Sequence, residues 1–274
     1  MKTMTKLAAV TLLALSSPAF AGKGGSADLI RQAVTSGSTD AIVAEVEKTE
    51  GLMCEDCVQM VTNLTQDNRY AVREVAGWWF AKRPALRDML ATQFEDDLNG
   101  NDSIRIRNAA DFLGATVTLT ALPQLRAAIT HGGLSTDAKL ALVRAAKALA
   151  HTGGNPILQT AMGDSDASVR AAAVVAWRDI LGQKSAQPVV ALLADRDANV
   201  RAQAATVIGG MTEMSGRAQL ETLLTDADPF VRRNAAWALG RLGQEASRAA
   251  LTTAANDASS IVRGVAKASL AQLH

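Results

Sequence analysis

The sequence predicts an all-α protein, folded as a right-handed superhelix, or solenoid, of helical hairpins. A Val-Arg pair recurs every 31 residues, at Val169-Arg170, Val200-Arg201, Val231-Arg232 and Val262-Arg263. After each Val the apolar positions fall at +4, +7 and +8, which mark one face of an α-helix. Aromatic residues make up only 4% of the chain against 48% hydrophobic residues in all, so the core must consist of Ala, Leu and Val. A fixed period of this size is typical of stacked repeats, each of which buries its apolar face against the next.

The first 21 residues are predicted to form a secretory signal peptide. Lys2 and Lys6 precede an apolar run from Leu7 to Leu15, and an Ala-Phe-Ala cleavage pattern ends at Ala21. The run is too short to cross a bilayer, and no later segment is apolar enough to insert into a membrane. We therefore expect cleavage after Ala21, a flexible arm over residues 22–25, and a mature protein that is periplasmic or secreted.

The chain has only two cysteines, Cys54 and Cys57, which lie near the start of a helix expected to run to about Leu64. In an oxidising compartment a pair this close predicts a disulfide. A second interpretation is a redox-active pair, because the N-terminus of a helix stabilises a thiolate. The negative charges of Glu55 and Asp56 oppose this second interpretation, as does the lack of a pattern of alternating strands and helices.

Two methionines, Met53 and Met60, flank the cysteines and allow a third interpretation. Two thiolates and a thioether on one turn of helix would suit a soft metal ion, Cu(I) above all. Methionine at helical spacing is more often part of the core, so no metal ligand and no cofactor is assigned here. The cysteines therefore stand as a disulfide or redox pair.

The largest aromatic cluster is Trp78-Trp79-Phe80. In the register of the repeats Trp78 corresponds to Trp237, a position that the other repeats fill with Phe112, Arg144, Val175, Thr206 and Ala268. Such variable occupancy is typical of a half-exposed position. The tryptophans are either buried wedges between repeats or anchors for a partner, and we take Trp78, Trp79 and Trp237 as the candidate partner-binding residues.

Each C-terminal repeat is predicted to be a hairpin of two helices, each of roughly ten residues. The first helix begins four residues before the Arg, where a side chain can accept hydrogen bonds from the first turn, at Asp166, Asp197, Asp228 and Ser259. Three residues after the Arg a small side chain lets a neighbouring helix approach closely, at Ala173, Ala204, Ala235 and Ala266. A second apolar stretch follows Gly182, Gly210 or Gly243 and forms the second helix.

The run from Asp226 to Gly240 resembles the bacterial HEAT-like repeat named after phycobilisome lyases. The resemblance is strong from residue 164 to 274 and weaker upstream, where the Arg position is filled at less regular intervals by Arg73, Arg107 and Lys139. It implies a single HEAT-like domain over residues 26–274, with about seven helical pairs and an extra N-terminal helix.

The recurring arginines are predicted to be structural. In the first three strict copies, Asp residues stand four and six positions before the Arg, so we expect an Asp–Arg ladder that joins neighbouring repeats and their turns. Removal of the two lysines of the signal peptide leaves 26 basic residues against 27 acidic ones. Nearly neutral chains have no strong electrostatic attraction to nucleic acid, so none is expected as a partner.

These observations favour an exported scaffold or adaptor that binds an unidentified protein or peptide, through a surface lined by the second helices of the hairpins. The chain contains no phosphate-binding loop, nucleophile elbow or zincin helix, so no enzymatic activity is assigned. The His-Glu pairs with which HEAT-like deoxyhypusine hydroxylases hold iron are missing, and export argues against phycobilin lyase activity. The alternative is a redox or soft-metal-binding protein of the cell envelope that uses Cys54 and Cys57.

Overall fold

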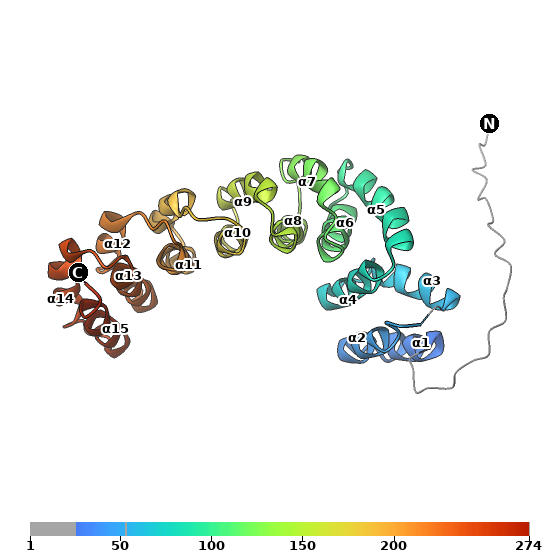
Figure 1. The fold of residues 1–274 in the computed structure, drawn as a ribbon, viewed down its shortest axis with the longest axis horizontal. Helices are drawn as coiled ribbons and strands as arrows, with labels where there is room; N and C mark the ends of the chain where they lie inside the picture. The colour runs from blue at the N-terminus through green and yellow to red at the C-terminus, as the bar shows by residue number, and fades with distance from the viewer. Residues whose placement is uncertain (1–25, 53, 274) are drawn as a thin grey trace.

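The computed structural model describes residues 26–52 and 54–273, in which every regular element is helical. The predicted signal peptide, the arm over 22–25, Met53 and His274 lie outside the described residues. Paired helices follow one another along an open arc (Figure 1). Within the described part of the chain, the only β-type pairing is an isolated bridge between Ser185 and Glu213. The all-α solenoid that the repeat period predicts is confirmed.

Two rows of helices make up the arc (Figure 1). The outer row consists of α1 (Ala27–Ser36), α3 (Glu55–Leu64), α5 (Pro84–Leu98), α7 (Leu122–Ala128), α9 (Asn155–Met162), η3 (Gln187–Ala194), α12 (Arg217–Leu223) and α14 (Arg248–Ala254). The inner row consists of α2 (Thr39–Glu47), α4 (Tyr70–Ala81), α6 (Ser103–Ala115), α8 (Thr136–Leu149), α10 (Ala167–Arg178), α11 (Ala198–Gly210), α13 (Pro229–Leu242) and α15 (Ser260–Leu270). Three short 3-10 helices lead into α7, α9 and α14, namely η1 (Leu119–Ala121), η2 (Thr152–Gly154) and η4 (Glu245–Ser247). Each helix of the inner row contacts its neighbours in that row.

The N-terminal end has two helices, α1 and α2, where the sequence predicts a single extra one. Gly37, at φ +72°, ends α1, and Ser38 begins α2 by accepting a hydrogen bond from the N–H of Ala41 (3.2 Å). Glycine adopts this left-handed conformation readily, so the chain turns back within two residues. The outer element η3 also differs from the predicted α-helix, since it is a 3-10 helix with Pro188 in its first turn.

The inner helices of the strict repeats begin where their acidic residues predict. The side chains of Asp166, Asp197 and Asp228 accept hydrogen bonds from backbone N–H groups of the first turn, at 2.7 to 3.1 Å. Hydrogen bonds from Ser168, together with one from Thr136, lower the pKa of Asp166 to about 2. The Val of each motif and the Ala column are fully buried, as their helical spacing requires.

Small residues let the inner helices approach closely. A Cβ atom added to Gly114 would lie 2.8 Å from the Cα of Ala145 on the next inner helix, and one added to Gly240 would lie 2.6 Å from the Cβ of Ser269. The helices that the Val-Arg motif opens therefore form the inner side of the arc (Figure 1). The second helices of the hairpins, on which the sequence places the expected binding surface, lie in the outer row (Figure 1).

The predicted Asp–Arg ladder is present and links each strict repeat to the next. Arg170, Arg201 and Arg232 form paired hydrogen bonds of 2.7 to 2.9 Å with carboxylates of the following repeat, namely Asp195, Asp226 and Asp257. The same arginines donate to backbone carbonyl oxygens in the loop before their own helix, as Arg170 does to Asp164 and Ser165. One side chain thus satisfies polar groups of two successive loops.

Candidate functional site

A hollow of about 200 Å³ opens on the inner row between α4, α6 and α8. Its lining includes Tyr70 and Trp78 of α4, Ala115 of α6, and Arg144 and Ala148 of α8. Trp78 is half-buried, and the ammonium of Lys82 lies 5.5 Å from its ring. The hollow therefore combines aromatic walls with one cation, Arg144, and with the carboxylates of Glu74 and Asp111, all from helices of the inner row.

Arg144 is held in place from two sides. Its guanidinium carbon lies 4.3 Å from the centre of the Tyr70 ring, and its Nε and Nη2 donate to the two carboxylate oxygens of Asp111 at 3.0 and 3.1 Å. Asp111 has a fully buried side chain and also accepts from Arg73, at 2.7 and 2.9 Å. Among the described residues, Nη1 of Arg144 has no acceptor. The buried carboxylate thus orients Arg144 and leaves one of its donor groups open.

The surroundings of Arg144 contain both positive and negative charges. Arg73 and Arg107 lie close by, and burial together with the charge of Arg73 lowers the pKa of Arg107. Towards solvent, the Tyr70 hydroxyl donates to Glu74 (2.7 Å), and burial with this hydrogen bond raises the pKa of Tyr70. The carboxylates of Asp67, Asp111 and Asp137 also act on this group of arginines, so with Glu74 the negative charges balance the positive ones. Arg144 is the most exposed of the three arginines.

A second hollow, of about 330 Å³, continues along the inner row from α8 to α10. Val143, Arg144 and Lys147 line it from α8, and Val175 lines it from α10 together with three alanines. Arg144 borders both hollows. The two hollows and the cation between them form one stretch of surface, which we call the Arg144 groove.

Trp237 lies farther along the same row, on α13, and 38% of it is exposed. Its ring covers Gly209 of α11, because a Cβ atom built on that glycine would lie only 2.5 Å from the Cζ3 atom of the ring. Trp78 and Trp237 thus share the inner row, but the helices α6 to α11 separate them (Figure 1). The structure does not bring these two candidates into one pocket.

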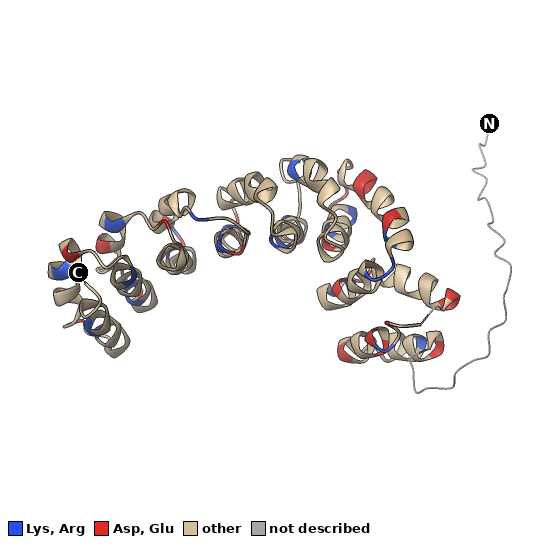
Figure 2. Cartoon of the chain, viewed as in Figure 1, with Lys and Arg blue, Asp and Glu red and all other residues tan. Residues whose placement is uncertain are grey.

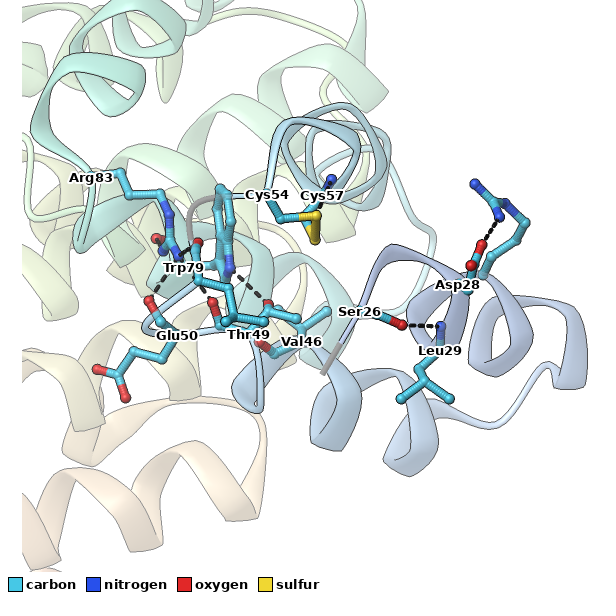
Figure 3. The surroundings of a disulfide bond; sticks show 12 residues. Ser26, Asp28, Leu29, Val46, Thr49, Glu50, Cys54, Cys57, Trp79 and Arg83 are labelled. Carbon is cyan, nitrogen blue, oxygen red and sulfur yellow. Dashed lines mark hydrogen bonds and ion pairs between the residues drawn. A yellow bond between two sulfur atoms is a disulfide. The ribbon is translucent and has the colours of Figure 1, made fainter. Parts of the chain in front are cut away.

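Trp79 is not accessible to a partner, which corrects its assignment as a binding residue. It is fully buried, its Nε1 donates to the Thr49 hydroxyl (2.9 Å), and Arg83 stacks on its ring at 3.4 Å (Figure 3). Arg83 also donates to three carbonyl oxygens of the loop between α2 and α3. Adjacent helical residues point about 100° apart, so Trp79 faces the core while Trp78 faces the hollow.

Cys54 and Cys57 lie at the start of α3 and are joined as a disulfide, with their Cα atoms 5.1 Å apart (Figure 3). Cys54 precedes the first residue of the helix, and its sulfur accepts a hydrogen bond from the N–H of Cys57 (3.1 Å). Cys57 is fully buried, whereas Cys54 is half-buried. The described residues contain no group of three or more His, Cys, Asp and Glu side chains placed to hold a metal ion.

Tyr70, Asp111 and Arg144 form a unit that the sequence analysis does not identify. Asp111 carries a signal, because a charged residue within the apolar part of an inner helix requires a partner when it is buried. Arg144 appears only as one of the residues that fill the position of Trp78. The hydrogen bond between Arg144 and Asp111 joins residues 33 apart, and the one between Arg73 and Asp111 joins residues 38 apart. No pattern within one repeat predicts contacts over such separations.

Comparisons with known proteins agree with this architecture. Residues 186–271 match the family of HEAT repeats. The structure of YibA from Escherichia coli aligns with 89% of this chain and 92% of its own, at 16% identity and a TM-score of 0.58. A chain of the complex of Kap95p with RanGDP aligns with 89% of this chain and 40% of its own, at 16% identity and a TM-score of 0.53. No curated protein is similar enough to count as a match.

The helices of the described residues are too short or too polar for any of them to cross a membrane. The likeness to solved structures, at such low identity, concerns the fold alone. The chain is therefore a helical repeat solenoid, and its residues 186–271 match HEAT repeats.

Proposed function

We propose that the protein is an exported scaffold that binds another protein or peptide through the inner row of its solenoid. The observation that carries the proposal is the accessibility of Trp78, Arg144 and Trp237 on that one row. Tryptophan and arginine are the residue types that most often dominate the energy of protein interfaces. The Kap95p chain, which shares the fold, binds RanGDP, and a long row of helices offers this chain a similarly extended surface.

The test is photo-crosslinking at single positions in intact cells. A photoreactive phenylalanine analogue placed at Trp78, or in a second strain at Trp237, should give a discrete crosslinked product. The same analogue at Met89, which is 63% exposed on the outer helix α5, should not. Equal crosslinking from both rows, or none from the inner row, would contradict the proposal.

We further propose that export removes residues 1–21, and that the strict repeats belong to the phycobilisome lyase-type of HEAT-like repeat. The short apolar run and the Ala-Phe-Ala pattern that ends at Ala21 support export. Sequencing the N-terminus of protein from the envelope fraction should read Gly22 first. Protein in that fraction that still begins with Met1 would overturn this part.

We propose that the Cys54–Cys57 bond is structural and not redox-active. An attacking thiolate can reach only the half-buried Cys54, and the negative charges of Glu55 and Asp56 in the same turn disfavour the thiolates of a redox-active pair. The bond also closes the first turn of α3 beside the loop that Arg83 and Trp79 hold in place (Figure 3). These contacts support a role in fixing the junction between the first two helical pairs.

A further inference from the structure

From the charge and shape of the inner row we infer that the occupant of the Arg144 groove is an acidic peptide segment that also carries a bulky apolar side chain. This inference rests on the proposed function, because it names the chemistry of the partner that the inner row binds. It follows from the distribution of charge, the open donor of Arg144 and the apolar lining of the two hollows.

Charge is divided unevenly along the molecule, although the whole chain is nearly neutral. Residues 26–98 contain 13 acidic and 7 basic residues, whereas residues 99–273 contain 14 acidic and 18 basic ones. Figure 2 shows the corresponding gathering of acidic segments towards α1 to α5. The part of the chain after α5 therefore attracts an acidic partner more strongly than the part before it, and Arg144 belongs to this later part.

Within the basic part, the inner row carries further solvent-accessible cations besides the arginines of the ladder, which are paired at the first turns of α10, α11 and α13. The acids stand at the first turns, where Asp166, Asp197 and Asp228 cap helices. Three of these further cations have carboxylate partners, since Arg144 binds Asp111, and Lys147 and Arg178 share Asp179. These cations are Arg144, Lys147, Arg178, Arg233 and Arg241. These five cations thus have two carboxylate partners, Asp111 and Asp179, which leaves an excess of positive charge along α8, α10 and α13.

Cations in the last turn of a helix also stabilise the helix dipole, so their position alone does not require a ligand. Arg144 is different, because it stands a turn earlier and is already bound to Asp111 and stacked on Tyr70. Its Nη1 has no acceptor in the part of the chain that the structure describes, and 32% of the side chain is exposed. A fixed guanidinium with an open N–H pair binds a carboxylate with little loss of side-chain entropy.

The hollows on either side of Arg144 require a second property of the peptide. The first is bounded by Trp78 and by small side chains such as Ala115 and Ala148, and the second by Val143, Val175 and alanines. Their exposed linings are mostly apolar and each is of side-chain size. A carboxylate on Arg144 would place the neighbouring residues of the peptide over these hollows, where a bulky apolar side chain removes both surfaces from water.

The test measures binding of labelled synthetic peptides to the mature protein by fluorescence anisotropy. The first peptide repeats Glu-Leu-Glu-Gly-Ser, the second replaces every Glu by Lys, and the third replaces every Leu by Ala. We expect the first to bind roughly tenfold more tightly than either of the others, and to weaken as salt is raised. Equal affinity of the Glu and Lys peptides would overturn the inference.

Charge reversal locates the effect on the inner row. Arg178→Glu with Arg241→Glu changes two exposed residues and should weaken the first peptide by roughly tenfold. Arg126→Glu with Arg248→Glu makes the same change in net charge on the outer helices α7 and α14 and should leave the affinity unchanged. Equal loss in both double variants would show attraction to net charge alone and would contradict the inference.

Two single variants test the specific contacts. Arg144→Gln should weaken the Glu peptides, and Trp78→Ala should weaken only the peptide that contains Leu. Circular dichroism identifies a single variant that is unfolded. In that case the double variant Arg178→Glu with Arg241→Glu, which changes only exposed residues, still tests the inference. Crosslinking from Trp78 without any preference for acidic peptides would refute this inference and leave the proposed function standing. Loss of row-specific crosslinking would refute the proposed function itself.

Discussion

The regular spacing of Arg170, Arg201 and Arg232 follows from the two partners that each side chain must reach. Arg170 donates to carbonyl oxygens five and six residues earlier and to a carboxylate 25 residues later. The guanidinium group of arginine can bind the carbonyl oxygens and the carboxylate at the same time, whereas lysine has a single ammonium group. Lys139, at the corresponding position upstream, makes one ion pair with Asp164 (2.7 Å). The lysine therefore keeps the 25-residue spacing of the ladder, and among these side chains only the arginines also bind the carbonyl oxygens of the preceding loop.

The ladder predicts that Asp195→Ala will destabilise the protein. Its carboxylate and the Arg170 side chain are almost wholly buried, at 7% and 6% exposure, so the change leaves Arg170 without its partner. We expect a loss of about 3 kcal/mol at neutral pH, measured by urea unfolding. Glu245→Ala, which breaks the exposed pair with Arg248, should leave the unfolding midpoint unchanged.

The same pair predicts how stability depends on pH. Hydrogen bonds from Arg170 lower the pKa of Asp195 below its ordinary value of 3.8, although burial works in the opposite direction. A lowered pKa in the folded state contributes stability that is complete above pH 3.8 and is lost as the pH falls through the folded-state pKa. The difference between the wild type and Asp195→Ala should therefore shrink below that pH. A difference that stays constant down to pH 2 would argue that the carboxylate acts through its shape and not its charge.

The cysteine pair predicts a small effect of its removal. Cys54→Ser keeps a side chain that can cap α3, and Cys57→Ala suits a fully buried position. Because the bond closes a very short loop, the double variant should lose only roughly 1 to 2 kcal/mol. Helicity and partner crosslinking should be retained. Loss of crosslinking with full helicity would favour the redox or metal-binding alternative.

Among the elements, the inner helices of the strict repeats are the ones that the sequence predicts best. Their starts follow from capping residues such as Asp197, and their buried faces follow from the spacing of Val200, Ala204 and Ile208. Both signals are local, so one repeat contains them entirely. The split between α1 and α2 depends on a single glycine in the left-handed conformation, and the Arg144 groove depends on inner helices of four repeats, α4, α6, α8 and α10. Such features need the assembled structure.

The close approach of inner helices predicts opposite effects for two glycine substitutions. Gly114→Ala would place a Cβ atom 2.8 Å from the backbone of Ala145, so α6 and α8 must separate. We expect a loss of about 1 to 3 kcal/mol from this overpacking, despite the better helix propensity of alanine. Gly264→Ala, in a helix but with open space around it, should instead stabilise by up to about 1 kcal/mol. Thermal melts of the two variants that shift in the same direction would contradict this account.

At the scale of the whole molecule, the array predicts that one full period can be removed. Deleting residues 226–256 removes α13, η4 and α14 and joins Thr225 directly to Asp257. Arg201 can then bind Asp257 as it now binds Asp226, because both acids stand at the same place in their repeats. The product should be highly helical and should melt in one cooperative transition, as measured by circular dichroism.

A deletion of half that length serves as the control. Removing residues 226–241 leaves the outer helix α12 followed directly by the outer elements η4 and α14, with nearly all of the inner helix α13 gone. The apolar face of an outer helix would then occupy an inner position, so this variant should lose cooperative melting. If both deletions were equally damaging, stability would depend on long-range contacts that a linear array does not have.

The Asp–Arg ladder also determines how the repeats should unfold under mechanical force. Each rung ties one repeat to the next only, so detaching the last pair of helices breaks the bond between Arg232 and Asp257 and leaves the one between Arg201 and Asp226 intact. When the molecule is pulled from its C-terminus, the repeats should therefore unfold one at a time. Each unfolding event should release roughly 105 Å of extended chain. Force spectroscopy should record these events as equal increases in extension. A single large unfolding event would contradict this prediction. A partner in the Arg144 groove would stay bound while the C-terminal repeats unfold under force.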